Sequence, residues 1–100
     1  MTLIVAGTVR VPPEMIDTFR PYMQAMIEHS RGEDGCIDYA YAQDVIDPGL
    51  IRVFEVWRDR AALEQHFASP HLAEWRAAWG QFGVSDRQLF AYEVASQTLV

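Results

Sequence analysis

The chain has 100 residues, of which half are hydrophobic and 22% are charged. This length and composition indicate one globular domain over residues 1–100 and exclude a disordered chain. Fourteen acidic residues against eight basic ones give a net charge of −6. Such a surface repels phosphate groups, so we expect no nucleic-acid partner and no membrane partner.

The cysteine content and the first residues predict a cytoplasmic protein. The single cysteine, Cys36, cannot form an internal disulfide and favours a reducing compartment. The N-terminal apolar run lacks a basic region and is interrupted by Gly7, Thr8 and Arg10, so it indicates a strand rather than a signal peptide. No apolar run approaches the roughly 20 residues that span a bilayer.

A strand and a helix are predicted first. β-branched residues indicate a strand from Leu3 to Val11, which a pair of prolines ends. Apolar residues then recur at helical spacing and predict an amphipathic helix to about Ser30. Because proline lacks the backbone donor, Pro21 is expected to kink this helix or to shift its start.

Two strands are predicted on either side of a turn. Ile37, Tyr39 and Tyr41 alternate along the second strand, and the third strand runs from Leu50 to Trp57. The sequence Asp47-Pro48-Gly49 between them is typical of a turn.

Two helices and a final strand complete the prediction. Asp59 can cap a helix that carries His66 on its apolar face. Ser69-Pro70 ends this helix and opens another one. The last strand is expected from Gln88 to Ala95.

This order predicts an α+β fold of the ferredoxin-like split βαβ type (β-α-β-β-α-β), with the helices on one face of a four-stranded sheet. The strands are nevertheless apolar on both faces, since Leu3 and Val5 alternate with Ile4 and Ala6. A sheet face without helices needs another cover. A second copy of the chain is the simplest cover, so we expect a homodimer.

A series of short features occupies the segment from Glu33 to Trp75. In chain order they are Glu33, Gly35-Cys36, Tyr39, Glu55-x-Trp57, Ala62-Leu63, His66 and Ser69-Pro70-His71. In this combination the chain resembles the antibiotic biosynthesis monooxygenase (ABM) family, and within it the quinol monooxygenase branch.

The resemblance implies a dimeric α+β barrel, with a pocket in each protomer between its own sheet and helices. It also implies a small phenolic or hydroquinone-like aromatic substrate that is oxidised by dioxygen without a metal or flavin cofactor. Another branch degrades haem with an Asn on the first strand and a Trp and a His on later helices. Here that strand has no Asn, His66 takes the place of the Trp, and Arg76 lies near that of the His. Haem degradation is therefore disfavoured.

Oxygenation without a cofactor needs a base that removes the phenolic proton and hydrogen-bond donors that hold the resulting oxyanion. It also needs apolar walls that shield the reactive intermediate from water. His66 and His71 are the candidate bases. His66 lies near a helix C-terminus, which favours its charged form, and the alternative is a core histidine. His71 lies in the first turn of its helix, which keeps the ring neutral, and the alternative is packing on Trp75.

Tyr39 is the candidate oxyanion donor, although strand tyrosines also supply packing area. Glu55 shares a face with apolar residues, where it would orient a histidine, contact the substrate or pair with an arginine. The candidate substrate-binding walls are Trp57, Phe67 and Trp75, with core packing as the alternative.

A metal site is not expected, because His66, His71 and Glu74 lack an established ligand spacing. The sequence therefore predicts a cofactor-independent monooxygenase with a histidine base. The alternative is a non-catalytic dimer that binds a small aromatic ligand in the same pocket.

Overall fold

The computed structural model describes residues 1–100 and contains one sheet and three α-helices. The elements in chain order are β1 (Leu3–Arg10), the 3-10 turn η1 (Pro13–Met15), α1 (Ile16–Arg31), β2 (Cys36–Gln43), β3 (Leu50–Trp57), α2 (Arg60–Phe67), α3 (Pro70–Phe82) and β4 (Ser85–Glu93). The strand order is β2-β3-β1-β4, and every neighbouring pair is antiparallel. The predicted ferredoxin-like α+β fold is confirmed.

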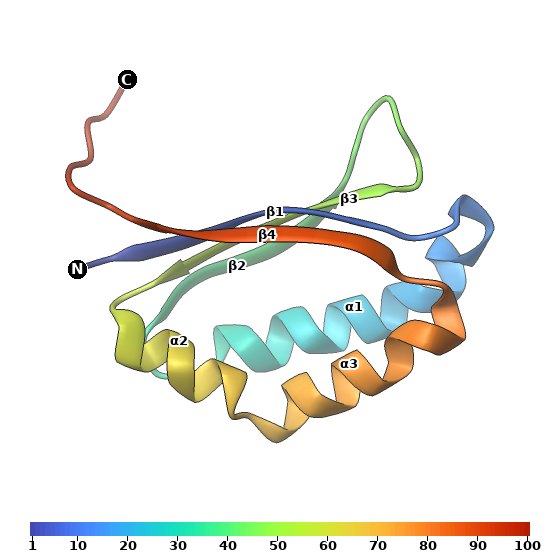
Figure 1. Cartoon of the computed structure of the whole chain (residues 1–100), viewed down its shortest axis with the longest axis horizontal. Helices are drawn as coiled ribbons and strands as arrows, with labels where there is room; N and C mark the ends of the chain where they lie inside the picture. The colour runs from blue at the N-terminus through green and yellow to red at the C-terminus, as the bar shows by residue number, and fades with distance from the viewer.

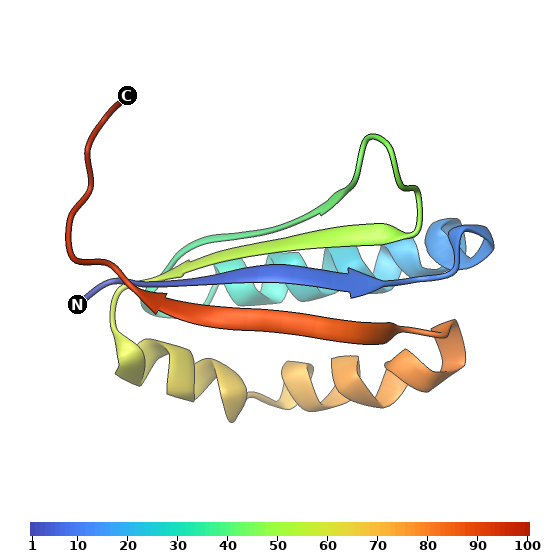
Figure 2. The same cartoon turned by 45° about the horizontal axis from the view of Figure 1, so that its top comes forward.

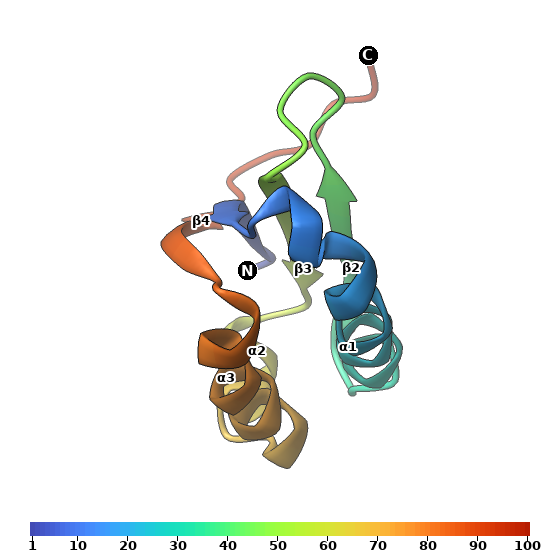
Figure 3. The same cartoon turned by 90° about the vertical axis from the view of Figure 1, so that its right-hand side faces the viewer.

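All the helices lie on one face of the sheet (Figure 1). Figure 2 shows the four strands side by side, with β2 and β4 at the two edges. Seen along the sheet, α1 lies below β2, whereas α2 and α3 follow one another below the β4 side (Figure 3). None of the helices combines the length and the apolar character needed to cross a bilayer.

Several element boundaries differ from the sequence prediction, and β1 ends at Arg10 rather than Val11. Helix α1 begins at Ile16 after a 3-10 turn and continues through Pro21, whose missing hydrogen bond is offset by buried neighbours on the same helix. Strand β4 begins at Ser85 rather than Gln88 and ends at Glu93 rather than Ala95. The early start follows from Gly83, which adopts the left-handed conformation (φ 72°) at the end of α3 and turns the chain at once into the strand.

The core between the sheet and the helices consists of two clusters. One surrounds Trp57, which is completely buried, and includes Leu3 and Leu63. The other surrounds Phe19 and includes Ile51. Together they join α1, α2 and α3 to the inner face of the three strands β1, β2 and β3.

The outer face of the sheet is apolar and uncovered in a single chain. Ala6 lies between Phe54 on β3 and Phe90 on β4, and Ile4 is the partner of Tyr92. Phe54, Phe90 and Tyr92 are 42%, 59% and 54% exposed. This is the face for which the sequence predicts a cover.

Candidate active site

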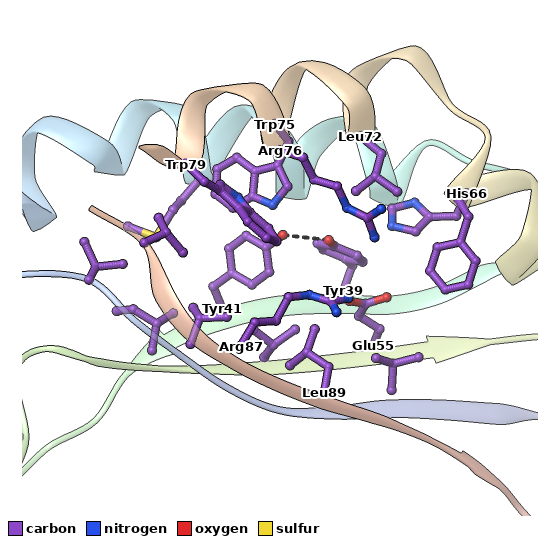
Figure 4. Close-up of a pocket in the computed structure, with 18 of the residues that line it drawn as sticks. Tyr39, Tyr41, Glu55, His66, Leu72, Trp75, Arg76, Trp79, Arg87 and Leu89 are labelled. Carbon is purple, nitrogen blue, oxygen red and sulfur yellow. Dashed lines mark hydrogen bonds between the residues drawn. The ribbon is translucent and has the colours of Figure 1, made fainter. Parts of the chain in front are cut away.

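A cavity of about 280 Å³ lies between α3 and the inner face of the sheet (Figure 4). Its lining comes mainly from β1, β2, β3, β4 and α3, and most of it is hydrophobic. The lining residues outside that class are Glu55, His66, Arg76 and Arg87. An apolar cavity with a few polar groups is the usual form of a small-molecule site.

His66 reaches the cavity because of how α2 is built. The Asp59 carboxylate caps this helix by accepting a hydrogen bond from the Ala62 backbone N–H at 2.9 Å. Leu63 is buried one turn before His66, so the imidazole lies on the same inward face and is 2% exposed. Its ring centroid lies 4.7 Å from that of Trp57.

Glu33 holds the imidazole of His66 from the turn between α1 and β2. The Nδ1 atom of His66 lies 3.0 and 3.1 Å from the two carboxylate oxygens. Gly35 has a left-handed φ of 83°, and a Cβ there would lie 2.5 Å from the Cβ of Ala62. The glycine therefore lets this turn approach α2 closely.

The contact with Glu33 sets the tautomer of His66. A carboxylate can only accept, so Nδ1 carries the hydrogen and the neutral ring has its lone pair on Nε2. Burial lowers the pKa of His66, although Glu33 acts in the opposite direction. The expectation that the helix C-terminus favours the charged form is wrong, because the loss of hydration outweighs it.

His71 contacts the same carboxylate oxygen of Glu33 as His66 does, and it is not part of the cavity lining. Its Nε2 atom is 2.5 Å from Oε1 of Glu33, and its ring stacks on that of His29 at 5.3 Å. The alternative of packing on Trp75 is not seen. This position does not suit the predicted direct contact of His71 with a substrate.

Tyr39 and Tyr41 place two hydroxyl groups in the cavity from alternate positions of β2. The two phenol oxygens are 2.6 Å apart and share one hydrogen bond, whichever of them donates (Figure 4). One O–H therefore remains free to donate to a ligand oxygen. Burial raises the pKa of Tyr39 and of Tyr41, so both groups stay protonated at neutral pH.

Glu55 is a buried carboxyl group in the cavity wall, with 5% exposure. Its Oε1 accepts a hydrogen bond from the indole N–H of Trp57 at 2.9 Å. It contacts neither a histidine nor an arginine through a hydrogen bond, contrary to two of the roles considered from sequence. Burial raises the pKa of Glu55 to about 7.

Two of the three predicted aromatic walls line the cavity. Phe67 is half-exposed at its edge, and Trp75 stacks on Tyr41 with a centroid distance of 5.6 Å. Trp57 is not in the lining, because its indole is completely buried behind Glu55. Trp79 is an additional wall; its spacing of four residues from Trp75 on one helix could have indicated it.

One group of side chains has the composition of a metal site. Ligand atoms of Glu33, His66 and His71 all lie within 4.8 Å of one another. Two imidazoles and a carboxylate can bind zinc or iron. The same carboxylate is also satisfied without a metal, by the hydrogen bond with Nδ1 of His66 and the close contact with Nε2 of His71. The sequence search missed this group because it paired the histidines with Glu74 rather than with Glu33.

The sequence matches the model of the family described as "Antibiotic biosynthesis monooxygenase" over residues 2–78. The chain belongs to this family. The resemblance found in the segment from Glu33 to Trp75 is thereby confirmed. Membership supports a monooxygenase type of function in general.

Curated relatives agree with this assignment. An "Uncharacterized protein sll1783" from Synechocystis is 36% identical over 97% of this chain and 67% of its own length. "Putative monooxygenase Rv0793" from Mycobacterium tuberculosis is 38% identical over 69% of this chain and 67% of its own length.

Solved structures show the same fold. A "putative antibiotic biosynthesis monooxygenase" from Deinococcus radiodurans superposes with a TM-score of 0.90 at 25% identity, covering 100% of this chain and 98% of the other. The structure of Rv0793 has a TM-score of 0.78 at 28% identity over 99% and 98% of the two chains.

Proposed function

We propose that this protein is a cofactor-independent monooxygenase that oxidises a small phenolic or hydroquinone-like aromatic with dioxygen, and that His66 is the general base. The supporting observation is the position of His66 between the cavity and Glu33. A buried neutral imidazole whose Nδ1–H is held by a carboxylate can accept a proton at Nε2 and is then stabilised as the cation.

The aromatic ring of the substrate binds between the apolar walls, among them Trp75 and Trp79. Nε2 of His66 takes a phenolic proton, and the free hydroxyl of the tyrosine pair, Tyr39 or Tyr41, donates to the oxyanion. The phenolate reduces dioxygen far more readily than the phenol does. His71 is a positioning residue, since it contacts the carboxylate that orients His66.

The reaction balances without an external reductant. A hydroquinone and one O₂ give a hydroxyquinone and one water, so that one oxygen atom forms a new bond to carbon and the other leaves in water. The substrate supplies all four electrons that reduce the two oxygen atoms. The apolar lining excludes bulk water from the intermediate.

We also propose that the active form is a homodimer in which two copies join through their outer sheet faces. The support is the uncovered apolar surface formed by Phe54, Phe90 and Tyr92. Burial of such aromatic side chains stabilises association by removing apolar area from water.

The test follows oxygen uptake by metal-stripped protein over a panel of hydroquinones, with autoxidation subtracted. Wild type is compared with His66→Gln and with Glu64→Gln, in which an exposed residue of the same helix outside the cavity is changed. We expect uptake proportional to protein, reduced about 100-fold or more in His66→Gln and unchanged in Glu64→Gln. Equal rates in both variants would refute His66 as the base.

The alternative function, a non-catalytic module that binds a small aromatic, predicts a different result. Aromatic ligands would then raise the melting temperature, while no member of the panel would give uptake above background. Substitution of His66 would change affinity alone.

A further inference from the structure

The eight arginines of this chain divide into two groups. Six contact an acidic side chain or a backbone carbonyl, namely Arg10, Arg20, Arg31, Arg52, Arg58 and Arg60. Arg76 and Arg87 have no hydrogen bond or ion pair within the chain, although acidic residues outnumber arginines by fourteen to eight. Their lack of partners is therefore not explained by a shortage of carboxylates.

Both unpaired arginines line the cavity, although each residue is also exposed to solvent. Arg76 comes from α3 and Arg87 from β4, and Figure 4 shows the two side chains extending from opposite walls toward the region of Tyr39 and Glu55. The charges of both arginines affect ionisable groups in the cavity lining. Arg76 contributes to the lowered pKa of His66. Arg87 opposes the rise in the pKa of Glu55.

The guanidinium of Arg87 also lies against an aromatic wall, with its Cζ 6.0 Å from the ring centroid of Trp79. This cation–π contact holds the group beside the space that an aromatic ring would occupy. Two guanidinium groups against one carboxyl group, Glu55, give the cavity lining an excess of positive charge in a chain whose net charge is −6. Planar guanidinium groups match the two oxygens of a carboxylate, and such charge-assisted hydrogen bonds are strong.

We propose that Arg76 and Arg87 together bind a carboxylate carried by the aromatic substrate, so that the substrate class is phenolic aromatic acids rather than neutral hydroquinones. This inference rests on the proposed function, since it takes the cavity as the substrate site. The volume of about 280 Å³ limits the ligand to one ring or two fused rings with small substituents.

The test measures binding of two probes that cannot react as hydroquinones. Naphthalene-2-carboxylate and naphthalene-2-carboxamide have the same ring and nearly the same shape, and they differ in charge. Titration calorimetry compares wild type with Arg76→Met, Arg87→Met and the double variant. Arg20→Met is the matched control, because Arg20 is exposed on α1, outside the cavity, and paired with Asp17. Circular dichroism checks that each variant is folded.

We expect wild type and Arg20→Met to bind the carboxylate at least about tenfold more tightly than the carboxamide. Each single cavity variant should lose about tenfold in affinity for the carboxylate, and the double variant should have no preference. The carboxamide should bind all the proteins equally. Equal affinity for the two probes, binding of neither, or a preference that survives the double substitution would overturn the inference.

The outcome is separable from that of the oxygenase test. A preference for the carboxylate probe, without oxygen uptake from hydroquinones that carry a ring carboxylate or from those that lack one, would support the arginine site and refute the oxygenase. Uptake from hydroquinones, without any preference of wild type for the carboxylate probe, would refute the arginine site and support the oxygenase.

Discussion

Nδ1 of His66 lies 3.0 Å from Oε1 of Glu33, although the two residues are 33 positions apart in the chain. This hydrogen bond joins α2 to the turn before β2 and determines which ring nitrogen carries the proton. It also places a carboxylate against the imidazole ring of His66, which would become positively charged when it takes a proton during catalysis.

Turnover should depend on pH through His66. Burial lowers its pKa below the ordinary value of 6.5, and a general base acts in its neutral form. We therefore expect oxygen uptake to be constant from about pH 8 to about pH 6.5 and to fall at lower pH. The measurement is uptake at saturating substrate in overlapping buffers. A profile that stays flat down to pH 5, with chemistry limiting the rate, would exclude His66 as the base.

Glu33→Gln should impair catalysis more than binding. The amide cannot stabilise the imidazolium, so we expect kcat to fall about 100-fold or more with little change in KM. Loss of the carboxylate, which acts to raise the pKa of His66, should also move the acidic limb of the pH profile to lower pH. Glu64→Gln, an exposed change on α2, is the control. A variant with the wild-type kcat would show that Glu33 has only a structural role.

Removal of metal ions should leave turnover unchanged if the metal-free arrangement of Glu33, His66 and His71 is the active one. Protein dialysed against a chelator is compared with untreated protein and with protein supplied with Zn²⁺ or Fe²⁺. Loss of uptake on chelation that one of these ions restores would instead assign the three side chains as its ligands.

Glu55→Gln should change how stability depends on pH. The folded pKa of Glu55 is about 7 against 4.5 for the free group, so its protonated form stabilises the fold fully below pH 4.5 and this contribution is lost as the pH rises through 7. Glutamine stays neutral throughout. The free energy of unfolding of wild type relative to the variant should therefore fall by about 3 kcal/mol between pH 4.5 and pH 8. Urea unfolding at the two pH values measures it, and a constant difference would contradict the assigned burial effect.

Phe54→Asp should dissociate the proposed dimer. The substitution puts an unpaired charge in the middle of the outer face, which we expect to weaken association about 100-fold or more. Sedimentation at micromolar concentration compares it with wild type and with Val45→Asp, a change at a fully exposed position between β2 and β3. A monomeric wild type, or a dimeric Phe54→Asp protein, would contradict the proposal.

The sequence could predict those parts of the molecule that depend on residues close together in the chain. Alternating apolar residues predicted β2, Asp59 predicted the start of α2, and helical spacing placed His66 on an inward face. Trp57 was misplaced because spacing shows which face a residue lies on. It does not show whether another side chain, here Glu55, stands between that residue and the cavity.

The central contacts of the site depend on the fold and have no local signal. The helix argument for His71 considered only its own first turn, whereas its partner Glu33 comes from another part of the chain. The unpaired state of Arg76 and Arg87 can be known only after the partners of the other arginines are known. A composition with an excess of acids even suggests that every arginine is paired.

Strand β4 contributes no buried residue to the core clusters, yet Arg87 and Leu89 of this strand line the cavity. It is an edge strand that pairs with β1 alone. Changes in its inward side chains therefore alter what the cavity accepts at little cost to folding. The chain thus separates into a scaffold that holds the buried core and one edge strand whose inward side chains face the ligand.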